Sequence, residues 1–217
     1  MKIGNMTDKE AEIMIETHSS KGKIWFLIST ILIVILSVLD NFFTYMGSAD
    51  LSLETNPLVY SLGFNWCGLI ISNVILIFIF IILVYYSLVK FKPEIIPCHD
   101  FKEYCSMIFF NRPDKFIWTL YKFPKNKRAY SYLFACIGYV CSILIPIIRL
   151  RAVLEWILLL SNKKLFYFYC ELIENISFNT LFGRFDNILM VVFIVIVLLI
   201  FWFFKEYSIN KKALNTE

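Results

Sequence analysis

Three apolar stretches, each long enough to cross a lipid bilayer, constrain the fold of this chain more than any other feature. They lie within residues 24–45, 57–89 and 188–204. A membrane-spanning helix needs about 20 mainly apolar residues, and soluble domains rarely contain such runs. The 217-residue chain is 59% hydrophobic and has a mean hydropathy of +0.69. The sequence therefore predicts an all-α, polytopic transmembrane helical bundle.

A fourth span is predicted at 130–148, although Pro146 lies inside it. Proline is tolerated in a membrane helix where neighbouring groups satisfy the carbonyl it leaves free. The apolar run Leu154–Leu160 is too short to cross, so we expect it to belong to an interfacial or re-entrant segment at about 150–186. Four spans are the first prediction. Five spans are the alternative, and they would leave the lysines of the C-terminal tail outside.

The basic residues predict the orientation. Nine of them lie in the loop at 90–129, whereas the loop between the first two spans has acids and no base. Bases accumulate on the cytoplasmic side of membrane proteins, so we expect the basic, aromatic-rich loop inside and the acidic loop outside. The polar tail 1–20 and the basic tail 205–217 would also be cytoplasmic. The cell membrane is the expected location. Because the bases are spread over several loops, nucleic acid is not an expected partner.

The cytoplasmic loop contains two further patterns. Aromatic residues alternate with bases from Glu103 to Phe123, which favours anchoring at the lipid surface over docking of a cytoplasmic partner. The group CHDFKEYC, from Cys98 to Cys105, brings thiols, His99 and Asp100 together, but its spacing is not that of a zinc site. We therefore expect an ordinary loop there, with no metal or other cofactor.

Polar residues mark the predicted outer ends of the first two spans. Asp40 and Thr44 share one helical face, because residues four apart lie one above the other. Glu54 and Asn56 precede Pro57, and together they have the features of a helix start with Asn56 as its cap. Asn65 and Asn73 are eight residues apart, so we expect both on one face of the second span.

The D-x3-T motif at Asp40–Thr44, followed by E-x-N-P at Glu54–Pro57, resembles a pattern in an uncharacterised family of small prokaryotic multi-pass membrane proteins. In that family an Asp and a Thr end one helix, and Glu-x-Asn-Pro opens the next. The resemblance covers about residues 35–84. It implies a helical hairpin with polar residues at its outer end, and no established activity comes with it.

Three functional hypotheses follow from the polar residues. In the first, Asp40 and Glu54 pair with Arg149 or Arg151 at the outer end of the third span, and this latch fastens the two hairpins of a non-catalytic component of a membrane complex. That protein would work with a membrane protein partner or as a homo-oligomer. We rank this hypothesis first because polar residues near membrane ends are most often packing devices.

The second hypothesis is a small transport component. Asp40, Thr44, Glu54, Asn56 and Asn65 offer the oxygen ligands that hard cations prefer. The third is an intramembrane enzyme that uses a carboxylate pair for acid–base chemistry. No recognisable nucleophile or metalloprotease motif supports the third hypothesis, and the sequence assigns no catalytic residue.

Overall fold

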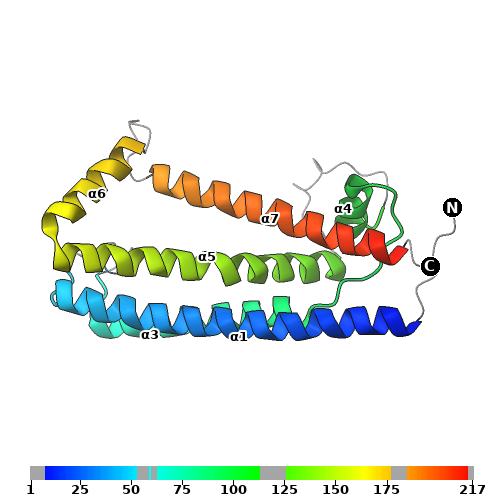
Figure 1. The fold of residues 1–217 in the computed structure, drawn as a ribbon, viewed down its shortest axis with the longest axis horizontal. Coiled ribbons are helices and arrows are strands. Elements are labelled where there is room, and N and C mark those ends of the chain that lie inside the picture. The colour runs from blue at the N-terminus through cyan, green and yellow to red at the C-terminus, as the bar shows by residue number, and fades with distance from the viewer. Residues whose placement is uncertain (1–7, 53–58, 60–62, 113–125, 177–184, 215–217) are drawn as a thin grey trace. The chain divides into compact units, whose positions relative to one another are not determined.

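The computed structural model describes residues 8–52, 59, 63–112, 126–176 and 185–214. Every regular element in these ranges is a helix (Figure 1). The long helices are α1 (Asp8–Gly47), α3 (Trp66–Tyr85), α5 (Lys127–Ser161) and α7 (Phe185–Leu214). A π-helical turn at Tyr86–Lys90 extends α3, and the two short helices are α4 (Phe101–Phe110) and α6 (Lys163–Ile176).

Four helical stretches are long and apolar enough to cross a membrane. They are Lys21–Gly47, Trp66–Lys90, Lys127–Ser161 and Val191–Leu214. Many of their large apolar side chains are exposed, which is the pattern expected where lipid is the solvent. The predicted all-α fold with four candidate spans is therefore confirmed.

Two helices continue beyond the residues predicted for their spans. The run Leu154–Leu160 is no separate piece, because α5 continues through it to Ser161 with Pro146 inside the helix. Likewise, the fourth predicted span ends at Phe204, whereas α7 continues to Leu214. Neither extension contains Gly or Pro, and Leu, Lys and Ala favour helix. Charged residues therefore shorten the apolar run in the sequence without ending the helix.

The start of α3 also differs from the prediction. Asn65 does not share a helical face with Asn73, because the helix begins at Trp66 and the side chain of Asn65 accepts a hydrogen bond from the Gly68 amide (3.0 Å). Just before it, Gly63 has a positive φ of 66°, a conformation that glycine adopts readily. Asn65 is thus an N-cap, which satisfies one of the free amides of the first turn.

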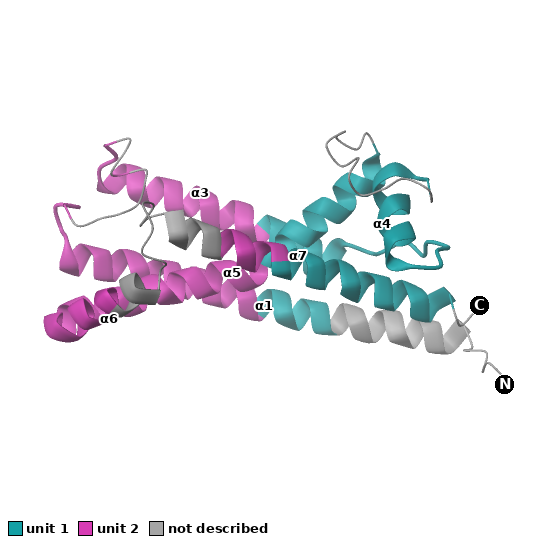
Figure 2. Ribbon diagram, turned by 90° about the horizontal axis from the view of Figure 1, so that it is seen from above, with its two compact units in different colours: residues 1–27, 82–141, 197–217 teal, residues 28–81, 142–196 magenta. Residues whose placement is uncertain are grey.

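The described chain divides into two compact units (Figure 2). Unit 1 contains residues 1–27, 82–141 and 197–217, and unit 2 contains residues 28–81 and 142–196. Each long helix contributes one part to each unit.

Unit 1 has a hydrophobic core where α4 packs with α5 and α7. Its fully buried members include Tyr104, Ile108, Tyr132, Cys136 and Trp202. Aromatic rings dominate the contacts of α4 with α7, since Phe101 stacks on Phe204 with ring centroids 4.0 Å apart. Aromatic pairs of this kind add stability beyond the area that they bury.

Small residues bring α5 close to the end of α3 within unit 1. Gly138 lies against the backbone carbonyl of Leu83, so a side chain at Gly138 would collide with it. One turn earlier, the hydroxyl of Ser87 donates to the carbonyl of Ala135 (2.6 Å). Small residues and hydroxyl groups are the common means of close helix packing in membranes.

In unit 2, the buried face of α1 is lined by hydroxyl residues. Ser37 and Thr44 are buried about two turns apart, with Ile33 on the same face, and Ser48 is buried just after the helix ends at Gly47. At the end of this helix, Gly47 lies against the ring of Trp156 from α5. The stripe of small side chains gives α1 a closely packed face, as membrane helices require.

Candidate functional site

A hydrogen-bonded polar network joins three helices inside unit 2. The guanidinium of Arg149 on α5 forms an ion pair with the carboxylate of Asp40 on α1 (2.5 Å). Its other terminal nitrogen donates to the amide oxygen of Asn73 on α3 (2.9 Å). Asn73 in turn donates to the side-chain oxygen of Asn41 (3.0 Å). One cation therefore holds groups from two other helices.

The residues of the network lie away from the ends of their helices. Asp40 is seven residues before the end of α1, Asn73 is seven after the start of α3, and Arg149 is twelve before the end of α5. At 1.5 Å per residue, these distances are roughly 10–18 Å. The sequence predicts that Arg149 ends the third span, and α5 continues beyond it to Ser161.

Because the side chains of this network are buried, their pairing matters for the stability of the protein. The side chains of Asp40 and Arg149 are 14% and 19% exposed, and Asn73 is 4% exposed. A charge inside the hydrocarbon region is costly unless it is paired. The planar guanidinium of arginine can bind two acceptors at once, which lysine cannot do in the same geometry. The arrangement therefore satisfies the buried carboxylate and ties α1, α3 and α5 together.

Arg151 does not join this network. It pairs with Glu155 one turn further along α5 (2.7 Å), and its side chain is 45% exposed. The hydroxyl of Tyr169 on α6 also donates to Glu155 (3.0 Å), so this second cluster joins α5 to α6. Burial and the nearby Glu155 carboxylate raise the pKa of Tyr169. Of the two arginines considered from the sequence, Arg149 alone contacts Asp40.

The other site residues predicted from the sequence are not seen in this network. Thr44 is buried on α1, where its carbonyl accepts from the Ser48 amide (2.8 Å), and Asn65 caps α3. Glu54 and Asn56 lie outside the described residues. Hence the structure brings together Asp40 and Arg149 from the predicted set, and it adds Asn41 and Asn73.

The loop acid Asp50 is satisfied by its own neighbours. Its carboxylate accepts from the backbone amide of Ser52 (3.1 Å) and from the hydroxyls of Ser52 (2.8 Å) and Ser48 (3.2 Å). These hydrogen bonds, led by the amide of Ser52, hold the pKa of Asp50 below its ordinary value. Asp50 therefore stabilises a turn without any basic residue, which explains part of the charge imbalance in this loop.

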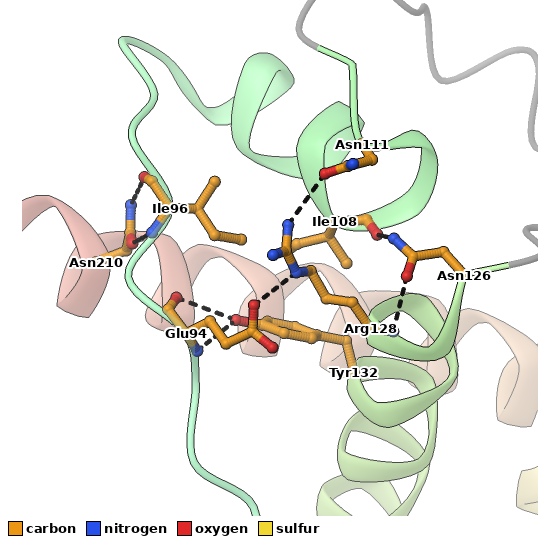
Figure 3. Close-up of polar contacts among 8 residues, drawn as sticks. All are labelled: Glu94, Ile96, Ile108, Asn111, Asn126, Arg128, Tyr132 and Asn210. Atoms are coloured by element: carbon orange, nitrogen blue, oxygen red, sulfur yellow. Dashed lines mark hydrogen bonds and ion pairs between the residues drawn. The ribbon is translucent and has the colours of Figure 1, made fainter.

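A second polar cluster, which the sequence did not predict, lies in unit 1 (Figure 3). The segment 91–98 is extended, and Pro93 and Pro97 exclude a helix there. Asn210 of α7 binds both backbone groups of Ile96, accepting from its amide (2.7 Å) and donating to its carbonyl (2.9 Å). A single buried asparagine side chain thus satisfies both backbone groups of Ile96, as a paired strand would do in a sheet.

Tyr132 and Arg128 of α5 hold the same segment. The hydroxyl of Tyr132 accepts from the amide of Glu94 (3.1 Å) and donates to its carbonyl (3.3 Å). The carboxylate of Glu94 pairs with Arg128 (2.7 Å), and Arg128 also donates to Asn111 at the end of α4 (3.4 Å). Asn210, Tyr132 and Arg128 therefore act as a clamp on segment 91–98, which we call the unit 1 clamp.

The CHDFKEYC group forms the start of α4. Asp100 accepts from the amide of Glu103 (2.7 Å), and Glu103 accepts from the amide of His99 (2.7 Å). This reciprocal pattern is a variant of the capping box. Among the described residues, no group of three potential ligands could hold a metal ion. Burial raises the pKa of Cys105 to about 12, so its thiol stays protonated.

The aromatic loop does not behave as one surface segment. Phe109 and Ile108 are buried in the unit 1 core, and Phe101 stacks on α7. The prediction of surface anchoring is therefore wrong for α4, because its rings find protein partners. Residues 113–125, which include Phe116 and Trp118, lie outside the described part of the chain.

The sequence contained a signal for the residues that were missed. Trp202, Glu206 and Asn210 are each four residues apart and are all buried. Residues at this spacing share a helical face, so two polar groups in line with a tryptophan indicate a packed face of α7. The charges at Lys205, Lys211 and Lys212 hide this signal, because they give residues 205–217 the composition of a basic tail.

The fold and the network define an α-helical protein with four helices suited to cross a membrane. No protein-family model, curated protein or solved structure matches the chain. Its function therefore has to be inferred from the residues themselves.

Proposed function

We propose that this chain is a multi-pass membrane protein in which the Asp40–Arg149–Asn73 network is a structural latch, and that the protein is a non-catalytic component of a membrane complex. The ion pair between Asp40 and Arg149 is the observation that supports the proposal. A carboxylate that ligates a cation or a substrate would need a free oxygen facing a polar space. Here the carboxylate is paired with a guanidinium, which satisfies its charge within the chain.

A transport role has less support from the same geometry. Asn65 caps α3, and none of the hydrogen bonds among the described residues joins the Thr44 hydroxyl to the Asp40 carboxylate. Hard cations bind six or more oxygens from the protein and water. A positive guanidinium within 2.5 Å of the carboxylate also disfavours a second cation there.

We propose that the N-terminus and the segment between α3 and α5 face the cytoplasm and that the cell membrane is the location. The strongest support is the excess of bases over acids in the described parts of unit 1, compared with an excess of acids in unit 2. The exposed Tyr167 and Phe168 of α6, beside Lys163 and Lys164, suit a helix at the lipid–water interface.

We also propose that the chain acts with a partner, either a second copy or another membrane protein. The resemblance of Asp40–Thr44 and Glu54–Pro57 to the uncharacterised prokaryotic family supports a common hairpin and suggests no activity. Lipid is the remaining partner, since many apolar side chains of the long helices are exposed.

Cation-dependent stability tests the latch against the transport role. The melting temperature of the purified protein would be measured in detergent with a chelator and then with added Na⁺, K⁺, Mg²⁺ or Ca²⁺. The latch predicts the same melting temperature in all five conditions, apart from a general effect of ionic strength that Glu155→Gln shares. A specific stabilisation by one cation that disappears in Asp40→Asn would contradict the latch.

A further inference from the structure

Unit 1 contains a buried acid that no part of the proposed latch uses. Glu206 on α7 is 5% exposed. Among the described residues it forms no ion pair with lysine, arginine or histidine. The nearest cation in sequence is Lys205, whose ammonium group lies over the ring of Tyr139 at 5.4 Å from its centroid. Buried acids in membrane helices are usually paired, so an unpaired one needs an explanation.

Several titratable groups lie within electrostatic range of this carboxyl group. They are Tyr104 from α4, Tyr132, Cys136 and Tyr139 from α5, and Lys205 from α7 itself. The hydroxyl of Tyr104 is buried near that of Tyr132, yet it has no partner with hydrogen-bond geometry among the described residues. The hydroxyl of Tyr132 is already bound to the backbone of Glu94.

The chemistry of these neighbours limits what Glu206 can bind. A hard metal ion would need several oxygen ligands, and no group of three His, Cys, Asp or Glu lies together in the described chain. A proton needs one oxygen, and it removes the charge that burial disfavours. The protonated carboxyl group also gains a hydrogen-bond donor, which a nearby hydroxyl oxygen can accept.

We propose that Glu206 is a proton-binding site and that its proton stabilises the packing of α4 and α5 against α7. Release transfers the proton from the carboxyl oxygen to a base in the solvent and leaves a carboxylate beside the aromatic core. Because α4 carries Tyr104 and the unit 1 clamp holds the segment before α4, loss of the proton loosens this whole side of unit 1. Packing on α7 therefore depends on pH.

Trp202 gives a direct signal for this site. It is four residues before Glu206 on the same face of α7, and it is 2% exposed. The test uses the full chain in lipid vesicles with Trp25, Trp66, Trp118 and Trp156 replaced by Phe, so that Trp202 is the only tryptophan. Its emission is recorded between about pH 5 and pH 9, because burial disfavours the charged form of a carboxyl group.

We expect one reversible red shift of Trp202 emission as the pH rises, and its loss in Glu206→Gln, whose neutral amide resembles the protonated acid. Glu94→Gln is the matched control, and it should keep the shift because Glu94 is exposed and paired with Arg128. Infrared spectra should show a protonated carboxyl band that disappears in Glu206→Gln and weakens as the pH rises.

Three results would overturn the proposal. The first is a Trp202 emission that does not change with pH. The second is a shift that persists unchanged in Glu206→Gln. The third is a shift that follows the concentration of Na⁺ or Ca²⁺ at constant pH, which would indicate a metal ion in place of a proton. A variant that fails to fold is recognised by loss of helical circular dichroism, and the infrared band of the unmodified chain then decides.

Discussion

Removing the charge of Asp40 leaves the guanidinium of Arg149 without its anionic partner inside an apolar stretch. In Asp40→Asn the shape of the side chain is nearly unchanged, so the loss is electrostatic. Asn73 still accepts one hydrogen bond from Arg149, but it cannot neutralise the charge. We therefore expect a large loss of stability from a substitution that creates no cavity.

The size of the loss follows from the burial of the pair. Breaking a buried ion pair by removing one partner costs about 3–5 kcal/mol, whereas an exposed pair contributes about 0–1 kcal/mol. Since the side chains of Asp40 and Arg149 are 14% and 19% exposed, we expect about 3 kcal/mol. For a chain of this length, this lowers the melting temperature by about 6–12 °C.

A double-mutant cycle separates the pair from its surroundings. Arg149→Gln alone should cost a similar amount, because it leaves a buried carboxylate. The Asp40→Asn/Arg149→Gln double variant should lose clearly less than the sum, with a coupling of about 2 kcal/mol, since no charge is then unpaired. The assay is thermal unfolding in detergent. Additive losses would refute the reasoning, as would a loss no larger than that of Glu155→Gln, which breaks the exposed Arg151–Glu155 pair.

Three further predictions concern orientation and unit 1. A cysteine at Leu51 in a cysteine-free background should react with an impermeant thiol reagent from outside, and one at Asn126 only after permeabilisation; the opposite pattern would reverse the proposed orientation. Asn210→Leu leaves the backbone groups of Ile96 buried and unsatisfied, which costs about 1–3 kcal/mol of stability for each group. Limited proteolysis should therefore cut segment 91–98 faster in Asn210→Leu than in the control Asn126→Leu. Because burial raises the pKa of Cys105 to about 12, its thiol should resist alkylation near pH 8 until detergent denaturation, and rapid labelling of the native protein would contradict its burial.

The helical class and the approximate positions of the four spans could be predicted from the sequence. A backbone in hydrocarbon must satisfy its own hydrogen bonds, so an apolar run of sufficient length has few structures open to it. The ends of α5 and α7 could not be predicted in the same way. Charged residues such as Arg149 and Glu206 interrupt an apolar pattern, but helix propensity and burial against other helices carry the helix through them.

Which polar residues meet was decided by tertiary structure. The sequence indicates that Asp40 needs a basic partner, and it offers Arg149 and Arg151 almost equally. Two residues along a helix differ by about 200° around its axis, so only one of them can face α1. The rotation of α5 about its axis directs Arg149 toward Asp40 and Asn73, whereas Arg151 pairs with Glu155. Hydropathy along one chain determines that a helix forms, but only the packing of several helices determines which of its faces is buried.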